Sequence, residues 1–354
     1  MSIGDATLRA AATAVRPFRD SDRARWERFV LDCPQATFFH RIGWREIHGE
    51  VFRHRPHYLV AERGEHIVGI LPLAQVKSLL FGHSLTSLPF AVYGGIAASD
   101  AEAEQALRQH AVQLGRELGV DHLELRSTAP GDPGWPEQDL YVTFRKELLP
   151  DVEANMLAIP RKQRAMVRKG QQRGLVSAID GDGPGRFFDL YADNLHRHGT
   201  PPHSKRYFRE LQRVFGDDCE ILTVFGPRAK AVSSVLSFHF RAEVLPYYAG
   251  DLVEARALAA NDFKYWELMR RACERGLRVF DFGRSKRETG SFEFKKNWGF
   301  EPTPLHYQYR LYKRATVPQN NPSNPRYRQA IDLWRRMPRR FVNAVGPMLA
   351  RHLG

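Results

Sequence analysis

Two adjacent lysines in an aromatic segment are the residues whose spacing most suggests chemistry. Lys295 and Lys296 lie in GSFEFKKNWGFEP, residues 290–302, between aromatic side chains on both sides. The alternating aromatics predict a β-strand, in which successive side chains point to opposite faces. Phe292 and Phe294 then face the core together with Lys296, and Lys295 projects from the other face, where a cation could stabilise an oxyanion or bind a phosphate. The alternative is a solvated lysine pair on an edge strand, which discourages aggregation.

Several histidines are also candidates. His239 lies in SFHF on a predicted strand, where it is either a general base or a histidine satisfied within the sheet. His196, His198 and His203 surround a Gly-Thr-Pro-Pro loop, a pattern more typical of a surface or substrate-facing loop than of a metal site. We therefore predict no metal.

The cysteines and the hydropathy pattern indicate a compartment. Cys33, Cys219 and Cys273 are scattered, without metal-ligand or redox spacing, and we interpret them as reduced core thiols of a cytosolic protein. The N-terminal sequence has no uninterrupted apolar core, and no run of about 18 apolar residues predicts a membrane-spanning helix. We expect a cytoplasmic protein.

Basic residues are concentrated in two places. The net charge of +13 favours polyanionic partners. Residues 159–175, IPRKQRAMVRKGQQRGL, predict a helix on which Arg161, Arg164 and Arg168 form a ridge, for either a phosphate contact or a solvated face. Residues 316–354 hold seven arginines and one aspartate, with apolar residues from Tyr327 to Leu349 at near-helical spacing. This tail predicts peripheral contact with an anionic membrane, or else docking of its apolar stripe onto the protein or a partner.

An internal repeat predicts how the candidate residues are positioned. Residues 93–127 and 248–285 each begin with a strand ending in Tyr-Gly-Gly or Tyr-Ala-Gly. Each continues through a long amphipathic helix with a glycine C-cap, at Gly119 or Gly276, and closes on a strand ending in Arg-Ser. The repeat therefore places Arg284-Ser285 at the end of a strand.

The segments before each copy also correspond. Hairpins are predicted over 57–76, turned at Arg63-Gly64, and over 220–240, turned at Gly226-Pro227. Helical sequence precedes them at 23–33, and at 186–199 with 205–216. This order predicts an α+β fold with helices packed on mixed sheets, formed twice. The predicted segments are two domains, 1–153 and 154–315, and a linker with a basic helical tail, 316–354.

Three further motifs resemble a known family. They are FDFGRS (280–285) followed by FEFKKNWGFEP and the strand LHYQYRL (305–311), the basic helix at 159–175, and TFFHRIGWREI (37–47). Together they resemble the Fem family of bacterial non-ribosomal peptidyltransferases, which are built of two tandem GNAT-like acyltransferase domains. More narrowly, the chain looks like the Fem-type proteins encoded with exosortase/PEP-CTERM exopolysaccharide systems.

The resemblance implies roles for residues at matching positions. Phe294 and Lys295 match the family's Phe-Lys pair, whose lysine steadies the transferred carbonyl. In the family, basic and tyrosine residues in the cleft between the domains contact the acceptor. The predicted substrate-binding residues here are Arg164, Arg168, Tyr247, Tyr248, Arg284, Ser285 and His239.

The presence or absence of a glycine-rich turn indicates which class of acyl donor the protein uses. GNAT enzymes that use acetyl-CoA bind its pyrophosphate with an Arg/Gln-x-x-Gly-x-Gly/Ala turn at a helix N-terminus. After YYAG this chain instead reads DLVEARALAAND, without glycine, so we predict no CoA cofactor of the usual kind. The best-known family members bind tRNA with the help of a coiled-coil arm, and no heptad insertion is visible here.

The sequence therefore predicts an acyl- or aminoacyltransferase. Its donor would be an aminoacyl-tRNA or an acyl thioester, and its acceptor an amine on an anionic glycan or lipid-linked precursor of the cell envelope or an exopolysaccharide. The alternatives are a CoA-dependent N-acyltransferase acting on exopolysaccharide sugars and a non-enzymatic RNA- or membrane-binding scaffold. DNA is not among the predicted partners.

Overall fold

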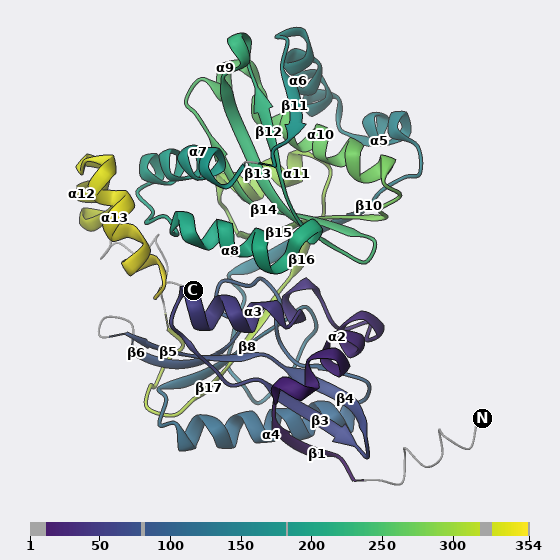
Figure 1. Ribbon diagram of the computed structural model, residues 1–354, viewed down its shortest axis with the longest axis vertical. Coiled ribbons are helices and arrows are strands. Elements are labelled where there is room, and N and C mark those ends of the chain that lie inside the picture. Colours follow the sequence, from purple (N-terminus) through teal and green to yellow (C-terminus); the bar gives the residue numbers. More distant parts are fainter. Residues whose placement is uncertain (1–11, 79–81, 182, 319–327, 353–354) are drawn as a thin grey trace. The chain divides into compact units, whose positions relative to one another are not determined.

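The chain folds as two units (Figure 1). The computed structural model describes residues 12–78, 82–181, 183–318 and 328–352. Of these residues, the first unit holds those up to Asp139 together with 305–318 and His352. The second unit holds Leu140–Pro304 and residues 328–351. The linker residues 319–326 and Tyr327 lie outside the described residues.

Two sheets form the strand framework of the first unit, as far as it is described. The antiparallel sheet β1-β3-β4-β7 consists of β1 (Ala14–Pro17), β3 (Leu59–Arg63), β4 (His66–Leu71) and β7 (Ala97–Ala98). The mixed sheet β2-β5-β6-β8-β17-β9 consists of β2 (Arg55–Pro56), β5 (Leu73–Ser78), β6 (Gly82–Ser87), β8 (His122–Ser127), β17 (His306–Leu311) and β9 (Glu137–Gln138). Strands β6 and β8 run parallel. The predicted hairpin turn at Arg63-Gly64 is confirmed, because β3 and β4 pair across it.

Helices of the first unit cover these sheets. They are α2 (Arg23–Asp32), α3 (Gly43–Glu46), which continues as a π-helical turn over Ile47–Val51, and α4 (Ala101–Glu117). The Asp100 side chain caps α4 by accepting a hydrogen bond from the Ala103 amide at 3.0 Å. The helix lies directly on the sheet, since a Cβ added to Gly69 would come within 2.8 Å of Leu107 Cδ1. Helix α4 therefore covers one side of the hydrophobic core of the first unit.

A single mixed sheet runs through the described part of the second unit. Its order is β11-β12-β13-β14-β15-β10-β16, with β11 (Val176–Ile179), β12 (Cys219–Phe225), β13 (Ala231–Phe240), β14 (Glu243–Asp251), β15 (Val279–Lys286), β10 (Tyr141–Glu147) and β16 (Pro302–Pro304). Strands β14 and β15 pair in parallel, and the other recorded pairs are antiparallel. The predicted hairpin turned at Gly226-Pro227 corresponds to β12 and β13.

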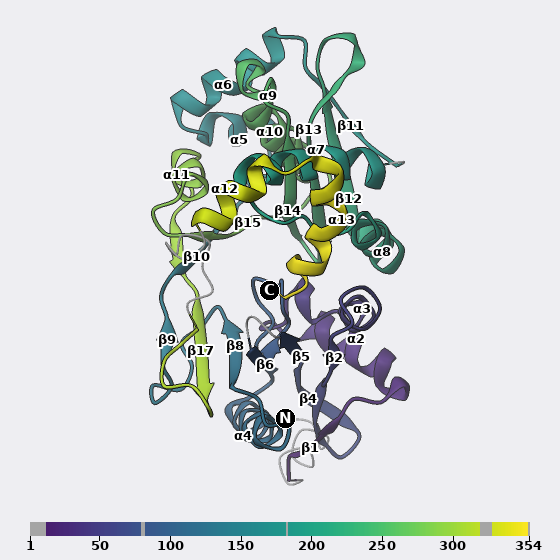
Figure 2. The ribbon, with the colours of Figure 1, turned by 90° about the vertical axis from the view of Figure 1, so that its left-hand side faces the viewer.

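Helices cover both faces of this sheet (Figure 2). Helices α7 (Gly183–His198) and α8 (Lys205–Phe215) cover one face. The other face is covered by α10 (Ala260–Glu274), against which α5 (Val152–Ala158) and α6 (Arg161–Gln172) pack, and the short α9 (Ala255–Leu258) precedes α10. Helix α7 lies very close to β14, because a Cβ added to Gly250 would meet the Tyr191 backbone nitrogen at 2.3 Å.

The two units exchange strands. Strand β10 follows the first unit in the chain but pairs with β15 and β16 in the second sheet. Strand β17 follows β16 but pairs with β8 and β9 of the first unit. The units therefore differ from the predicted segments 1–153 and 154–315, which followed chain order. Short strands of this kind carry no sequence signal that names a partner far along the chain.

The segment that holds the lysine pair is a helix, and the predicted strand is wrong. Helix α11 spans Gly290–Asn297. The Thr289 side chain caps its first turn, and Gly299, with φ of +76°, follows its end. The aromatic spacing also fits a helix, because Phe294 and Trp298 at i and i+4 have ring centroids 6.0 Å apart. Lys295 and Lys296 do lie on different sides, but Lys295 is the buried one and points into the core.

A second correction concerns the first copy of the repeat. Tyr93-Gly94-Gly95 does not end a strand, but lies in the loop between β6 and β7. The rest of this copy matches the prediction, with α4, Gly119 at φ of +61° and strand β8 in order.

The C-terminal tail consists of α12 (Arg328–Arg336) and α13 (Arg339–Ala350). Both views show these helices beside α7 (Figures 1 and 2). None of the described helices has the length and apolarity needed to cross a membrane.

Candidate functional site

The parallel strands β14 and β15 of the second unit diverge along their length. Their Cα pairing is confined to Glu243 with Val279 and Val244 with Phe280, although the strands have nine and eight residues. Strand β14 has a register shift against β13 between Leu236 and Ser237, which is a β-bulge. Strand β15 bends at Gly283, whose φ is +65°. The facing edges beyond Val244 therefore present main-chain groups that the β14–β15 ladder does not use.

The bulge in β14 carries Tyr247 and Tyr248. The Tyr248 hydroxyl lies 3.0 Å from that of Tyr207, and burial raises the pKa of Tyr248. The Tyr247 ring lies 4.8 Å from that of Tyr248 and 5.3 Å from that of Phe238. Neighbouring strand residues normally face opposite ways, so the bulge explains why both rings lie on the face covered by α8. Both side chains remain about half-buried.

Strand β15 carries Arg284 and Ser285 beyond its bend. The Arg284 guanidinium lies over the Tyr141 ring, 4.4 Å from its centroid, in cation–π geometry. Ser285 is 3% exposed, and its hydroxyl has no hydrogen-bond partner among the described residues. A buried hydroxyl without a partner is uncommon and suggests that a water or a ligand completes it. The predicted residues Tyr247, Tyr248, Arg284 and Ser285 therefore all lie where the two strands diverge.

Lys295 reaches β15 from α11. Its ammonium donates to three consecutive carbonyl oxygens, those of Phe282 at 2.7 Å, Gly283 at 3.0 Å and Arg284 at 3.1 Å. The Phe144 and Phe282 rings lie 5.5 and 5.7 Å from Nζ. Burial lowers the pKa of Lys295 to about 7, although Asp281 nearby acts in the opposite direction. The side chain therefore clamps the bend of β15 immediately before Ser285.

Phe294 fixes the helix that presents this lysine. Its ring packs on those of Tyr265 at 5.6 Å, Phe282 at 6.2 Å and Trp298 at 6.0 Å. The Phe-Lys pair thus consists of an apolar anchor and a cation that binds the main chain.

The other predicted residues lie elsewhere in the second unit. Arg164 and Arg168 are on α6, and Arg164 Nη1 donates to the Leu157 carbonyl at 3.1 Å. His239 is buried on β13 opposite Val244, where β14 and β15 are still paired. Its Nε2 lies 3.8 Å from Glu220, too far for a hydrogen bond. None of the described contacts joins the two arginines of α6 or His239 to Tyr247 or Tyr248.

Two charged residues near the site were missed. Lys264 is fully buried, and its ammonium donates to Asp251 Oδ1 at 2.8 Å, which fixes the end of β14. Asp262 lies in the first turn of α10, where it accepts a hydrogen bond from Trp298 Nε1 at 3.0 Å, and burial raises its pKa. The signal for Asp262 was its place in the first turn of the long helix after YYAG, where acidic residues are favoured.

The corresponding region of the first unit is filled by its own chain. The Gly94 amide donates to the Arg126 carbonyl at 3.2 Å, and Gly95 approaches Ser127 so closely that a Cβ would lie 2.5 Å from its hydroxyl. The Arg126 side chain is held by Glu124 at 2.8 Å and by the Ala91 carbonyl at 3.0 Å. A cavity of about 150 Å³ remains beside this segment.

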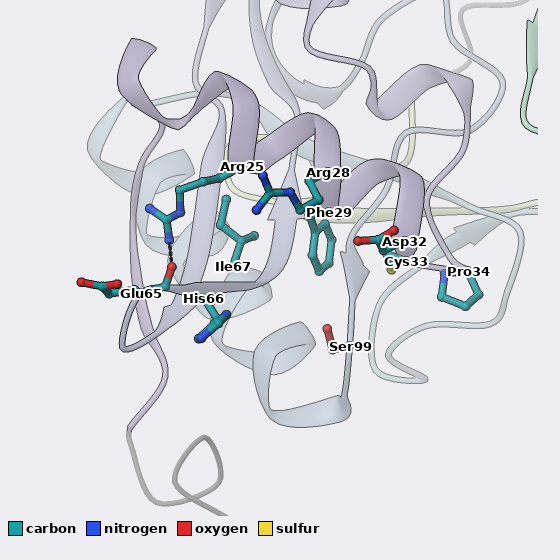
Figure 3. Close-up of a pocket in the computed structure, with 10 residues that line it drawn as sticks. All are labelled: Arg25, Arg28, Phe29, Asp32, Cys33, Pro34, Glu65, His66, Ile67 and Ser99. Carbon is teal, nitrogen blue, oxygen red and sulfur yellow. Dashed lines mark hydrogen bonds between the residues drawn. The ribbon is translucent and has the colours of Figure 1, made fainter. Parts of the chain in front are cut away.

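A larger pocket, of about 430 Å³, lies between α2 and the β3–β4 hairpin of the first unit (Figure 3). Its Arg25 donates to the Glu65 carbonyl and pairs with Glu62 at 2.8 Å. The Cys33 thiol beside it donates to the Ala98 carbonyl at 3.9 Å. The pocket contains none of the predicted site residues, so the second unit remains the better candidate.

Comparison with known proteins identifies the fold. Residues 159–296 match the model of an acetyltransferase (GNAT) domain, a range that includes β14, β15 and Lys295. A crystal structure of FemX superposes with a TM-score of 0.67 at 14% identity, over 85% of this chain and 98% of that one. A tandem GNAT protein from the clavulanic acid biosynthesis pathway gives 0.55 at 13%, over 86% and 100%. The predicted fold of tandem GNAT-like domains with mixed sheets is confirmed.

A third structure extends the comparison. The C-terminal domain of a putative lysylphosphatidylglycerol synthetase from Agrobacterium fabrum gives a TM-score of 0.58 at 13% identity, over 82% of this chain and 92% of that one. A search of curated proteins finds no significant match. The domain match supports an acyltransferase, and the similar structures show the fold.

Proposed function

We propose that the protein is an acyltransferase of the Fem type, which transfers an acyl or aminoacyl group to an amine of a cell-envelope or exopolysaccharide precursor. The observation that carries this proposal is the divergence of β14 and β15. It leaves main-chain groups that the β14–β15 ladder does not use beside Tyr247 and Tyr248 on one strand and Arg284 and Ser285 on the other. Main-chain amides of this kind can bind a carbonyl oxygen as its charge develops.

The chemistry requires one nucleophilic displacement. The acceptor amine attacks the acyl carbon of the donor, and the carbonyl oxygen becomes an oxyanion. The intermediate collapses as the carbon–oxygen bond of an aminoacyl ester, or the carbon–sulfur bond of a thioester, breaks. The amine proton leaves to the departing group or to water. In this proposal the Arg284 guanidinium holds an anionic acceptor during this step, while the buried Ser285 hydroxyl, which faces the other side of the strand with Val142, donates to a water or group on that side.

We assign Lys295 a positioning role. Its three hydrogen bonds hold the carbonyls of residues 282–284, which set the direction of the chain entering Ser285. The predicted direct contact of Lys295 with an oxyanion would require the ammonium to leave at least one of these carbonyls. A positioning role needs no such rearrangement, and a displacement of about 1 Å in a reacting group can cost 10²-fold in rate.

The donor is better explained as an aminoacyl ester than as a CoA thioester. In a CoA-dependent GNAT enzyme, the pyrophosphate binds at the N-terminus of the helix after the bulged strand. Here the short α9 and then the long α10 follow that strand, and Asp262 lies in the first turn of α10. A carboxyl group at this end competes with a phosphate for the helix dipole and the free amides. CoA-dependent acylation of exopolysaccharide sugars remains the alternative because the matched domain model is that of an acetyltransferase.

The acceptor of the reaction and its place in the cell are also proposals. The resemblance of the motifs at 280–302 to the Fem family supports a precursor acceptor, and we place the protein in the cytoplasm beside the inner membrane. Association with exosortase/PEP-CTERM systems follows from the sequence resemblance alone. A non-enzymatic scaffold is the remaining alternative.

The proposal is tested with two labelled donors. Purified full-length protein is incubated with a cell-envelope precursor extract and either labelled aminoacyl-tRNA or labelled acyl-CoA. We expect label to reach an amine of the precursor from aminoacyl-tRNA, and Ser285→Ala to lower kcat/KM by about tenfold. Transfer from acyl-CoA alone would favour the alternative enzyme. No transfer from either donor would favour the scaffold.

A further inference from the structure

The tail helices bury one side against the second unit. Val342, Gly346 and Ala350, at i, i+4 and i+8 of α13, are buried. A Cβ added to Gly346 would lie 2.6 Å from Pro202 Cδ, so α13 packs closely on the loop between α7 and α8. Arg339 pairs with Asp193 of α7 at 3.1 Å. Of the predicted apolar stripe, Ile331 and Trp334 of α12 dock onto the protein: Ile331 Cγ2 would lie 2.5 Å from a Cβ added to Gly199, and Trp334 is 8% exposed.

The other side of the tail is apolar and exposed. Phe341 is 49% exposed and Met348 is 61% exposed, and Val345 lies between them on the same helical face. Leu333 of α12 is 57% exposed. Three of the nine large hydrophobic side chains that the described residues expose lie in these two helices, so the exposure is concentrated there.

Cationic side chains border this apolar strip. Arg340 is exposed beside Phe341 and Met348 on the helical wheel of α13, and Arg336 is exposed at the end of α12. Residues 316–354 contribute a net charge of +6 to the chain's +13. An apolar strip with an arginine border complements an anionic lipid surface, because apolar side chains enter the headgroup region while the arginines meet the phosphates.

We propose that the exposed face of α13, formed by Phe341, Val345 and Met348 with Arg340 beside them, binds the surface of an anionic membrane while the opposite face stays docked on the second unit. The loop under α13 continues from Pro202 to His203, whose ring lies 5.6 Å from that of Tyr248. The membrane contact is thus connected to the candidate site through packed side chains of one unit. This inference does not depend on the transfer reaction.

Vesicle sedimentation of the full-length protein tests the surface. One vesicle population is phosphatidylcholine alone, and the other has roughly one third phosphatidylglycerol to supply negative charge. We expect binding to the anionic vesicles only, reversed by high salt. The double variant Phe341→Ser/Met348→Ser should reduce the partition coefficient by about tenfold or more, because two inserted apolar side chains are lost. Arg336→Gln/Arg340→Gln should reduce it as well.

The matched control substitutes exposed leucines outside the tail, as Leu31→Ser/Leu157→Ser. These residues are 53% and 58% exposed, and the control should bind anionic vesicles as the unchanged protein does. Equal binding by the control and the Phe341→Ser/Met348→Ser variant would overturn the proposal, as would equal binding to neutral vesicles. A concentration-dependent dimer that the Phe341→Ser/Met348→Ser variant dissolves, without vesicle binding, would instead assign the strip to contact between two copies.

Discussion

Replacing Lys295 with methionine removes the clamp on β15 while keeping an unbranched apolar side chain. The change deletes three hydrogen bonds, of 2.7 to 3.1 Å, to the carbonyls of Phe282, Gly283 and Arg284. It also deletes a charge that is costly to bury, so the net effect on stability depends on pH. A positioning role predicts a loss of about 10²-fold in kcat, because the chain leading to Ser285 is no longer held.

The pH dependence of the free energy of unfolding gives a better-defined expected value than the loss in kcat. Burial lowers the pKa of Lys295 to about 7 in the folded protein, whereas an unfolded lysine titrates near about 10.4. Between these values the unfolded state binds the proton and the folded state does not, so the free energy of unfolding contributed by Lys295 rises with pH. The slope approaches about 1.4 kcal/mol per pH unit within this window and vanishes below it, where both states are protonated.

Urea unfolding at several pH values above 7 measures this slope. We expect Lys295→Met to lose it, and Lys296→Met, which changes the exposed neighbour, to keep it. Identical slopes for the unchanged protein and Lys295→Met would refute the buried, neutralised lysine. Unchanged turnover in Lys295→Met would refute the positioning role.

Three other substitutions give separable outcomes. Gly250→Ala should lower the free energy of unfolding by about 1–3 kcal/mol, because its Cβ would meet the Tyr191 backbone at 2.3 Å, and calorimetry would detect this. Ser285→Ala should leave the melting temperature unchanged, since the hydroxyl has no described protein partner, and a lower Tm would show that it is structural. Asp262→Asn should tighten acyl-CoA binding in calorimetric titration by removing an anion from α10, and unchanged affinity would argue against competition at that helix end.

Local patterns in the sequence predict most of the framework. The helices α2, α6, α7 and α8 and both hairpins follow from apolar periodicity and turn residues, which act within a few positions. The repeat also gives the order of strand, helix and strand around α10, and of helix and strand from α4 to β8. The strand exchange by β10 and β17 is set by partners more than a hundred residues away, which local patterns do not specify.

The site is less predictable than the framework. Tyr247, Tyr248, Arg284 and Ser285 could be singled out, but their meeting depends on a bulge in β14 and a bend at Gly283. The lysine segment was misinterpreted because its alternating aromatics also satisfy helical spacing, and Thr289 and Gly299 supply the cap and the stop. That misreading reversed the direction of Lys295, although its separation from Lys296 was predicted.

Locating the donor on the protein tests the proposed site most directly. A photoreactive aminoacyl-ester analogue is cross-linked to the full-length chain, and the modified peptides are identified by mass spectrometry. Donor binding where β14 and β15 diverge predicts cross-links to the β14 peptide with Tyr247 and Tyr248 and to the β15 peptide with Ser285, displaced by excess unlabelled donor. Cross-links concentrated instead around Gly94, Gly95 and Ser127 of the first unit would contradict it.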